Sequence, residues 1–122
     1  MLILHWNGSS WGKAATPKLP SNNQVLGLAA ASATNVWAVG SYGRSPAPFT
    51  RTLIMHWNGK AWSTVTSPNA DLSSSFDAVS AHSVSDAWAV GIACVSACNV
   101  VGAARIDTPL LAHWNGKTWS VG

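Results

Sequence analysis

Three histidines recur at regular positions and could, by residue type alone, bind a metal ion. His5, His56 and His113 each begin the same motif, HWNG followed by two variable residues and Trp. A zinc ion needs its ligand nitrogens about 2.1 Å away, and equivalent positions on successive repeat units diverge. We therefore expect each histidine to form a hydrogen bond across its own unit instead. The sequence predicts no metal site and no cofactor.

The only two cysteines, Cys94 and Cys98, stand close together in the segment CVSAC. We expect a local disulfide between them, which suits an oxidising compartment, with free thiols as the alternative. Two thiolates without a second Cys or His pair leave a zinc site incomplete. The CxxC spacing of redox-active thiols is absent. The pair is therefore expected to clip a loop.

Four aspartates are the only carboxylates of the chain: Asp71, Asp77, Asp86 and Asp107. General acid and base catalysis needs two such groups, or one and a nucleophile, held together, and their spacing does not predict this. Asp86 holds the position of Asn35 in the other repeat, where we expect the side chain to cap a turn. The serines lack the spacing of a nucleophile elbow or a triad. We therefore expect no enzyme activity.

Tryptophans flanking the HWNG turns are the strongest candidates for ligand binding. An exposed indole can stack on the apolar face of a sugar, and we expect one ring of each pair to face an interface while the other lies nearer solvent. The opposing interpretation is that the rings fill space between sheets. Repetition of weak sites would add avidity. The candidate residues are Trp6, Trp11, Trp57, Asn58, Lys60, Trp62, Trp114, Lys117 and Trp119.

An internal repeat positions these residues. His5 and His56 are 51 residues apart, Trp37 and Trp88 are also 51 apart, and His56 and His113 are 57 apart. The second copy therefore carries six extra residues (57 − 51 = 6), which fall after its WAVG motif. Periods of this size are typical of solenoids and propellers, whose units cannot bury their faces alone.

Each repeat reads as two β-hairpins. A run of small residues such as Leu28 to Ser32 leads through turn residues into WAVG. The segment Leu53 to Trp57 then alternates, so its odd-numbered residues share one face. Asn58 and Gly59 make a tight turn because both tolerate positive φ, and Trp62 to Thr66 returns.

This pattern predicts an all-β fold of four-stranded antiparallel β-propeller blades. We expect two blades, at residues 24–67 and 76–122, the second with an inserted loop at 92–108, and one extra outer hairpin at residues 1–15. Within a blade, the strand of small residues is innermost, because blades converge toward the axis. WAVG forms the second strand, the HW segment the third, and the strand after the turn the outermost.

Composition and charge narrow the possible classes of protein. The 122 residues are 48% hydrophobic and 9% charged, which fits a globular chain. The net charge of +3 comes from seven scattered Lys and Arg residues rather than a basic run, so we expect no binding to nucleic acid. No apolar stretch reaches the roughly 18 residues that a membrane span needs. The start of the chain also lacks a signal-peptide pattern.

The segments LIMHWNGKAWSTVTSPN and FDAVSAHSVSDAWAVG resemble the tandem repeats of large, mostly secreted bacterial β-propeller proteins, over essentially the whole chain. The resemblance implies a propeller fold and an extracellular or cell-envelope location, but no common activity. The hairpin is also similar to that of sialidase-type Asp-box repeats, but Trp57 and Met55 stand where that box has Asp and Ser. Sialidase chemistry is therefore not carried over.

A looser likeness is to small two-blade propeller lectins that bind fucose, whose WDGxxW hairpins place aromatic rings beside a sugar and whose short chains assemble into a ring. Their Arg and Glu sugar ligands have no match in these repeats. Two blades and a hairpin cannot close a ring, since propellers use about four to eight blades, and open edges and apolar faces drive association. We predict a homo-oligomer, with three chains favoured and two or four chains, a filament, or a fragment of a longer propeller as alternatives.

Two functions are compatible with the sequence. The first is a non-catalytic extracellular binding module, lectin-like, that takes a glycan through its repeated Trp hairpins. The second is a structural, self-assembling propeller unit without a small-molecule ligand, in which the tryptophans are buried. The solvent exposure of Trp62 and Trp119 distinguishes the two.

Overall fold

The computed structural model describes residues 1–43, 49–69, 72–98 and 100–122. Within these ranges the chain forms β-strands and no helix, so the prediction of an all-β fold is confirmed. No helix that could cross a membrane is present in the described ranges. Asp71, one of the four aspartates, lies outside them.

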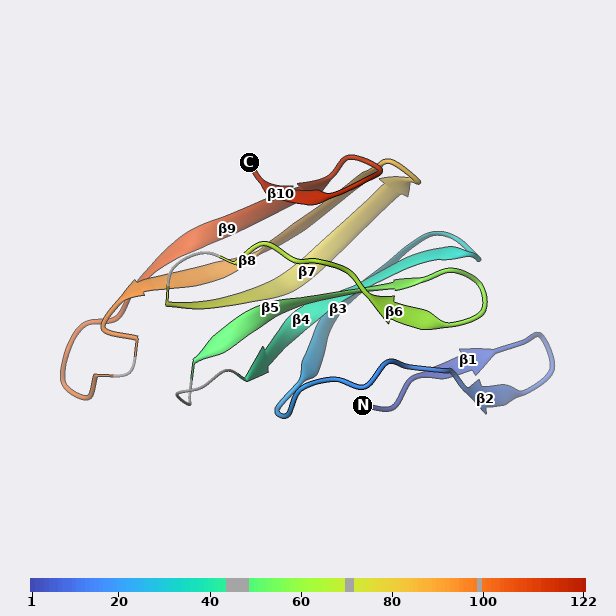
Figure 1. Cartoon of the computed structure of the whole chain (residues 1–122), viewed down its shortest axis with the longest axis horizontal. Helices are drawn as coiled ribbons and strands as arrows, with labels where there is room; N and C mark the ends of the chain where they lie inside the picture. The colour runs from blue at the N-terminus through green and yellow to red at the C-terminus, as the bar shows by residue number, and fades with distance from the viewer. Residues whose placement is uncertain (44–48, 70–71, 99) are drawn as a thin grey trace.

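The strands pair in sequence order into three antiparallel sheets (Figure 1). The N-terminal hairpin is β1–β2, the first sheet has the order β3-β4-β5-β6, and the second sheet has the order β7-β8-β9-β10. Within each four-stranded sheet, this is the order expected from the sequence. The bounds are β1 Leu4–Trp6, β2 Trp11–Lys13, β3 Gln24–Ser32, β4 Asn35–Gly43, β5 Thr50–Trp57, β6 Trp62–Thr64, β7 Ser73–Ser83, β8 Asp86–Ser96, β9 Ile106–Trp114 and β10 Trp119–Val121.

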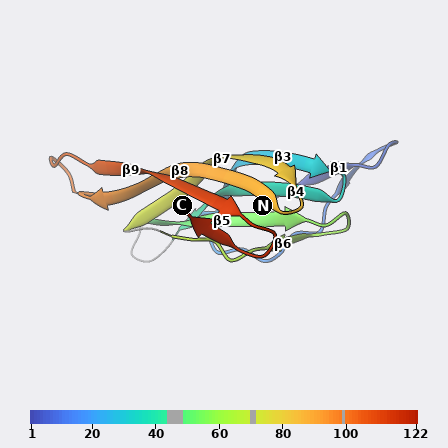
Figure 2. The same ribbon diagram turned by 90° about the horizontal axis from the view of Figure 1, so that it is seen from above.

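The two larger sheets pack face to face, with the N-terminal hairpin on the far side of the first sheet (Figures 1 and 2). Strand β7 contacts β3, β4 and β5. The backbones approach closely at Gly27 of β3, where an added Cβ would lie 2.9 Å from Ala78 Cα. Large residues would not fit between these strands, so the small residues of LAAAS and VSAH have a steric cause.

The glycine that ends each WAVG motif is fixed by a bulge in the neighbouring strand. Pairing of β3 with β4 shifts register between Val25 and Gly27, and pairing of β7 with β8 shifts between Phe76 and Ala78. The bulged strand turns a carbonyl toward the glycine opposite. An added Cβ on Gly91 would therefore overlap the backbone of Ser75.

The HWNG turns are four-residue loops rather than two-residue turns. Asn58 N–H donates to Ala61 O at 3.3 Å, and Asn58 Oδ1 accepts from the backbone N–H groups of Lys60 and Ala61 at 2.9 and 3.0 Å. Only Gly59 takes a positive φ, of 98°. The asparagine therefore holds the loop through its side chain, and the expectation that it shares the positive φ was wrong.

Part of the region 92–108, which was expected to be an inserted loop, is strand instead. Strand β8 continues to Ser96 and β9 begins at Ile106, and the two pair along this length. Ile92 to Cys94 are the register equivalents of Ser41 to Gly43, so β8 extends beyond its counterpart β4 by Val95 and Ser96. Val95 is β-branched, which favours a strand there. Cys94 and Cys98 form a disulfide in this segment, with a Cα–Cα distance of 5.8 Å. The structure also starts β7 at Ser73, ahead of residue 76.

Substitution of the WAVG glycine tests this account of the bulge. Gly91→Ala should lower the free energy of unfolding by about 1–3 kcal/mol, because the new methyl group forces the two strands apart. Gly12→Ala is the matched control, since an added Cβ there meets nothing within 4 Å, and its effect should stay within about 0.5 kcal/mol. Urea unfolding of both variants gives the comparison, and equal stabilities would contradict the bulge account.

Candidate functional site

Each four-stranded sheet has two different faces, and both are built twice by the repeat. The single-Trp face carries Trp37, Val39 and Ile54 in the first sheet, which all lie in the core between the sheets. The opposite, paired-Trp face carries Leu53, Met55, Trp57 and Trp62. Residues Leu110, Ala112, Trp114 and Trp119 form the paired-Trp face of the second sheet, and Trp88, Val90 and Leu111 form its single-Trp face.

The interior contact joins unlike faces. The single-Trp face of the first sheet packs against the paired-Trp face of the second, and the Trp37 ring lies 5.0 Å from that of Trp114 and 5.1 Å from that of Trp119. Phe76, Ala89 and Ala112 complete this core. The sheets therefore stack head to tail, and a stack of this kind has two unlike ends.

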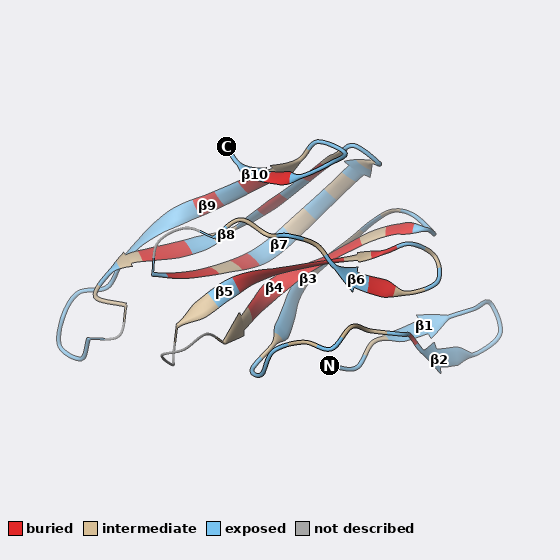
Figure 3. Ribbon diagram, viewed as in Figure 1, coloured by how far each residue is buried: buried red, intermediate tan, exposed pale blue. Residues whose placement is uncertain are grey.

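One end of the stack is an open apolar face. Trp88, Val90 and Leu111 of the second sheet are 41%, 44% and 38% exposed, whereas their equivalents Trp37, Val39 and Ile54 are 2%, 0% and 1% exposed. Figure 3 shows the same contrast along the strands. Strand register places Val90 beside Leu111, so the exposed side chains form one continuous strip.

The other end is half covered by the N-terminal hairpin. Ala14 is buried against the paired-Trp face of the first sheet, the His5 ring lies 5.2 Å from that of Trp57, and Trp62 N–H donates to Ala15 O at 3.0 Å. The hairpin strands themselves are exposed throughout (Figure 3). The hairpin therefore covers the outer strands of the sheet and leaves the inner strands open.

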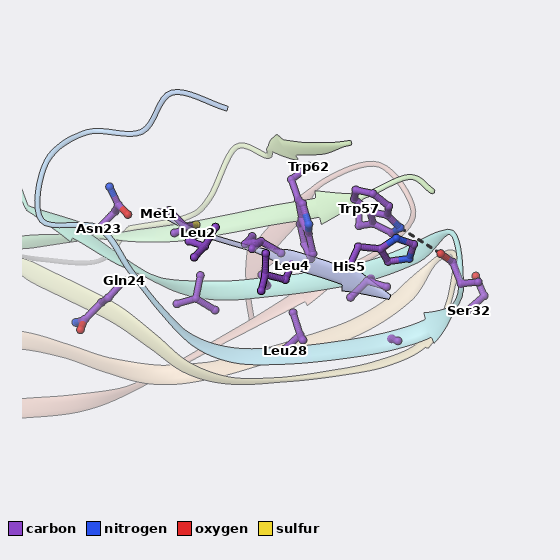
Figure 4. A pocket seen from close by; sticks show the side chains of 16 residues that line it. Met1, Leu2, Leu4, His5, Asn23, Gln24, Leu28, Ser32, Trp57 and Trp62 are labelled. Atoms are coloured by element: carbon purple, nitrogen blue, oxygen red, sulfur yellow. Dashed lines mark hydrogen bonds between the residues drawn. The ribbon is translucent and has the colours of Figure 1, made fainter. Parts of the chain in front are cut away.

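The uncovered half is an apolar groove of about 660 Å³ between β1 and the first sheet (Figure 4). Leu4 of β1 and Leu28 of β3 lie on opposite sides of it, and both are more than half exposed. Val25, Ala30 and Ala38 also line it. Sequence analysis missed this groove. The signal that could have found it is Leu28, a large apolar residue that begins the run LAAAS of otherwise small residues.

The candidate tryptophans lie together in pairs and most of them are buried or half-buried, although Trp57 and Trp62 contribute to the lining of the groove. Ring centroids are 5.7, 5.8 and 6.0 Å apart in the three hairpins. Trp57, Trp62 and Trp119 are buried, and Trp114 is half-buried. Both rings of a pair share one face because Trp57 pairs directly with Trp62 across the turn. The expectation that one ring of each pair faces solvent is therefore wrong for Trp57 and Trp62.

The N-terminal pair is the exception. Trp6 and Trp11 are 48% and 66% exposed. Among the polar candidates, Asn58 is part of the turn, and the backbone N–H of Lys117 donates to Asn115 Oδ1 at 2.8 Å. Lys60 is exposed beside its turn, as Lys117 is. Among the three hairpins, as far as their described residues show, only the N-terminal one therefore carries an exposed pair of tryptophans.

The histidines hold the hairpins of each sheet together. Nε2 of His56 and Nε2 of His113 lie 2.6 and 2.7 Å from the Oδ1 atoms of Asn35 and Asp86, which confirms the predicted bond for these two histidines but not for His5. Asn35 and Asp86 were expected to cap turns, but their side chains bind these histidines instead. His5 contacts Trp57, and its side chain forms no hydrogen bond to an Asn or Asp among the described residues. No group of metal-ligating side chains gathers within the described ranges.

A small cleft opens between the two sheets beside His56. It measures about 190 Å³ and is lined by Asn35, Trp37, Ser63 and Trp114, among others. Two buried donors at its wall, Asn35 Nδ2 and Trp37 Nε1, have no hydrogen-bond partner in the described part of the chain. The cleft thus combines indole rings with unsatisfied polar atoms.

No protein-family model, no curated protein and no solved structure matches this chain. The internal repeat is therefore the only template against which its open surfaces can be compared. The covered face of the first sheet shows what kind of surface would cover the exposed residues of the second sheet. The covered face of the second sheet shows the same for the exposed residues of the first.

Burial predicts how stability changes with pH. Desolvation lowers the pKa of His56 from its usual 6.5, so the unfolded chain binds its proton more readily than the folded chain. The contribution of His56 is complete above pH 6.5 and is lost as the pH falls from there through the folded pKa. The melting temperature should fall between about pH 7.5 and about pH 5, and fall less in His56→Gln. His5→Gln, at an exposed histidine, should keep the full fall; an unchanged fall in His56→Gln would contradict the prediction.

Proposed function

We propose that this chain is a non-catalytic assembly module, in which two propeller-type blades and an unfinished third bind further sheets of the same kind. Its partner in solution is a second copy, which makes the protein a homo-oligomer, and its setting is extracellular or the cell envelope. The single observation that carries the proposal is the open single-Trp face of the second sheet. The same residues, one repeat earlier, form the interior of the molecule.

Energetics favour covering this face. Burial of apolar surface contributes roughly 25 cal/mol per Å², and a stable interface buries about 800 Å² on each partner. The strip of Trp88, Val90, Ile92 and Leu111 gives the apolar centre that such an interface needs. Convergence of the inner strands at Gly27 supports a stack that curves toward an axis, as blades do. Three chains would supply six blades.

Burial of the paired tryptophans favours assembly over repeated glycan sites. Trp62 and Trp119, whose exposure distinguishes the two functions, are 8% and 6% exposed. Carbohydrate binding remains the second candidate because of one observation, the inter-sheet cleft with its unsatisfied donors Asn35 Nδ2 and Trp37 Nε1. The half-buried Trp114 at this cleft would be the stacking surface for a sugar ring.

Charge placed on the open face should disrupt association. A Val90→Glu, Leu111→Glu double variant should raise the dissociation constant at least tenfold, or about 1.4 kcal/mol, without loss of folding, since both side chains are exposed in the single chain. Val84→Glu, on a turn and 77% exposed, is the matched control. Light scattering after size-exclusion chromatography measures the mass. A wild-type monomer at every concentration, or equal behaviour of the two variants, would refute the assembly function.

Glycan binding has a separate test. A glycan array with the wild-type chain, followed by tryptophan fluorescence titration of any hit, should give a response that Trp114→Ala abolishes and Trp11→Ala leaves intact. Trp11 is exposed but lies on a separate hairpin from the cleft. A blank array, or binding lost in Trp11→Ala instead, would remove the cleft as a sugar site.

A further inference from the structure

The N-terminal hairpin matches the outer half of a four-stranded sheet. Its sequence LILHWNGSSW repeats LIMHWNGKAW of β5–β6, and its first strand stands at the same offset of 51 residues. In both complete sheets, the strand equivalent to β1 pairs on its other side with a WAVG strand: β5 with β4, and β9 with β8. Strand β1 pairs with β2 alone in the described part of the chain.

The backbone of β1 presents an open edge. Ala14 N–H donates to Ile3 O and Asn7 N–H donates to Ser10 O, so the odd-numbered residues bond toward β2. Alternation along an antiparallel strand then turns the amides of Leu4 and Trp6 away from β2. In β5, the equivalent residues Met55 and Trp57 pair with Ala38 and Val36.

Two side chains of the N-terminal hairpin, Trp6 and His5, stand at repeat positions whose side chains form hydrogen bonds in the complete sheets. Trp57 Nε1 donates to Ala33 O at 3.2 Å and Trp114 Nε1 donates to Val84 O at 3.0 Å, each across to the turn of the inner hairpin. Trp6 stands at the same repeat position and is 48% exposed. His5 likewise stands where His56 and His113 bind an Asn or Asp side chain.

The groove lies where an inner β-hairpin, which offers these hydrogen-bond partners in the complete sheets, would sit. In the second sheet, Phe76, Val79 and Ala81 are covered by Trp37 and Val39 of the preceding inner hairpin. Their equivalents in the first sheet are Val25, Leu28 and Ala30, which line the groove. Phe76 is 0% exposed, whereas Val25 is 38% exposed. The uncovered residues are thus those that an inner hairpin covers elsewhere in the same molecule.

We propose that the groove and the open edge of β1 form a docking site for an inner-type β-hairpin. Such a hairpin consists of a strand of small residues, a turn, and a second strand that begins with Asn or Asp, continues with any residue and ends with Trp-Ala-Val-Gly. The bound hairpin pairs its WAVG strand with β1 and lays its Trp and Val over Val25 and Leu28. It accepts from Trp6 Nε1 through a turn carbonyl and binds His5 through its Asn or Asp. This completes a third sheet, and it rests on the proposed assembly function.

Geometry decides between this occupant and two others. An intact second copy does not fit, because each of its inner hairpins already carries an outer hairpin where β1–β2 lies. A small apolar ligand would fill the groove but leave the amides of the β1 edge without partners, and those amides need acceptors when covered. A free inner-type hairpin satisfies both the apolar surface and the strand edge.

A fusion supplies the occupant in the same chain. Met1 stands at the repeat position of Thr52, so a duplicate of residues 24–51 placed directly before Met1 continues the repeat in register. Amide hydrogen exchange of Leu4 and Trp6 should slow at least tenfold relative to the parent chain. The matched control carries Gly40→Val in the duplicate only, which blocks pairing of the added hairpin because a side chain there overlaps Gln24, and it should leave the exchange unchanged.

The outcomes separate this proposal from the assembly function. Exchange at Leu4 and Trp6 within twofold of the parent chain, with Ala89 and Ala112 still protected, would overturn the docking site. Should the fusion lose protection at Ala89 and Ala112, a synthetic peptide of residues 24–43 is titrated against the unmodified chain. Failure of the peptide to slow exchange at Leu4 would then overturn the site. Association through the Val90 face is measured separately on the unmodified chain, so either idea can fail alone.

The groove side of the contact has its own variant. Leu28→Asp should leave the parent chain folded, since Leu28 is 65% exposed, but should remove at least half of the slowing that the fusion produces. Equal slowing in the fusion with and without Leu28→Asp would show that the added hairpin does not lie over β3, which contradicts the proposal.

Discussion

The contact between unlike sheet faces around Trp37 is the interaction on which the rest of this structure depends. The ring of Trp37 lies against His56 of its own sheet at 4.5 Å and against Trp114 and Trp119 of the next. The facing surface provides room because Ala89 and Ala112 are small. A large side chain in one face thus needs a small one in the other, and two identical faces would not pack in this way. Stacking is therefore directional.

Directional stacking explains why the two ends of the molecule differ. At one end the face that contains Trp88 and Val90 is partly exposed in the described part of the chain, and at the other the N-terminal hairpin covers only half of the matching surface. His56 and His113 also connect the two hairpins of their sheets, through Asn35 and Asp86 respectively. The repeat unit is consequently a complete sheet of two hairpins, and the N-terminal hairpin corresponds to the outer half of such a sheet.

Sequence patterns predicted the strand order because small residues, WAVG and HWNG each have a local steric or turn requirement. They also predicted the His bonds and the shared face of Leu53, Met55 and Trp57. They did not predict that Trp62 is buried, although its direct pairing with Trp57 follows from the turn length. The length of β8 depends on its long-range pairing with β9, and the groove depends on which part of a sheet is left uncovered. A local sequence pattern predicts neither.

Oxidative footprinting of the eight tryptophans by mass spectrometry, in dilute solution, tests the unlike-face contact most directly. The account predicts slow modification of Trp37, Trp62 and Trp119 and fast modification of Trp11 and Trp88. Trp37 and Trp119 are buried between the two sheets and Trp62 is buried with Ala14 of the N-terminal segment, whereas Trp11 and Trp88 are exposed. Fast modification of Trp37 together with protection of Trp88 would mean that the sheets pack through other faces, and would contradict it.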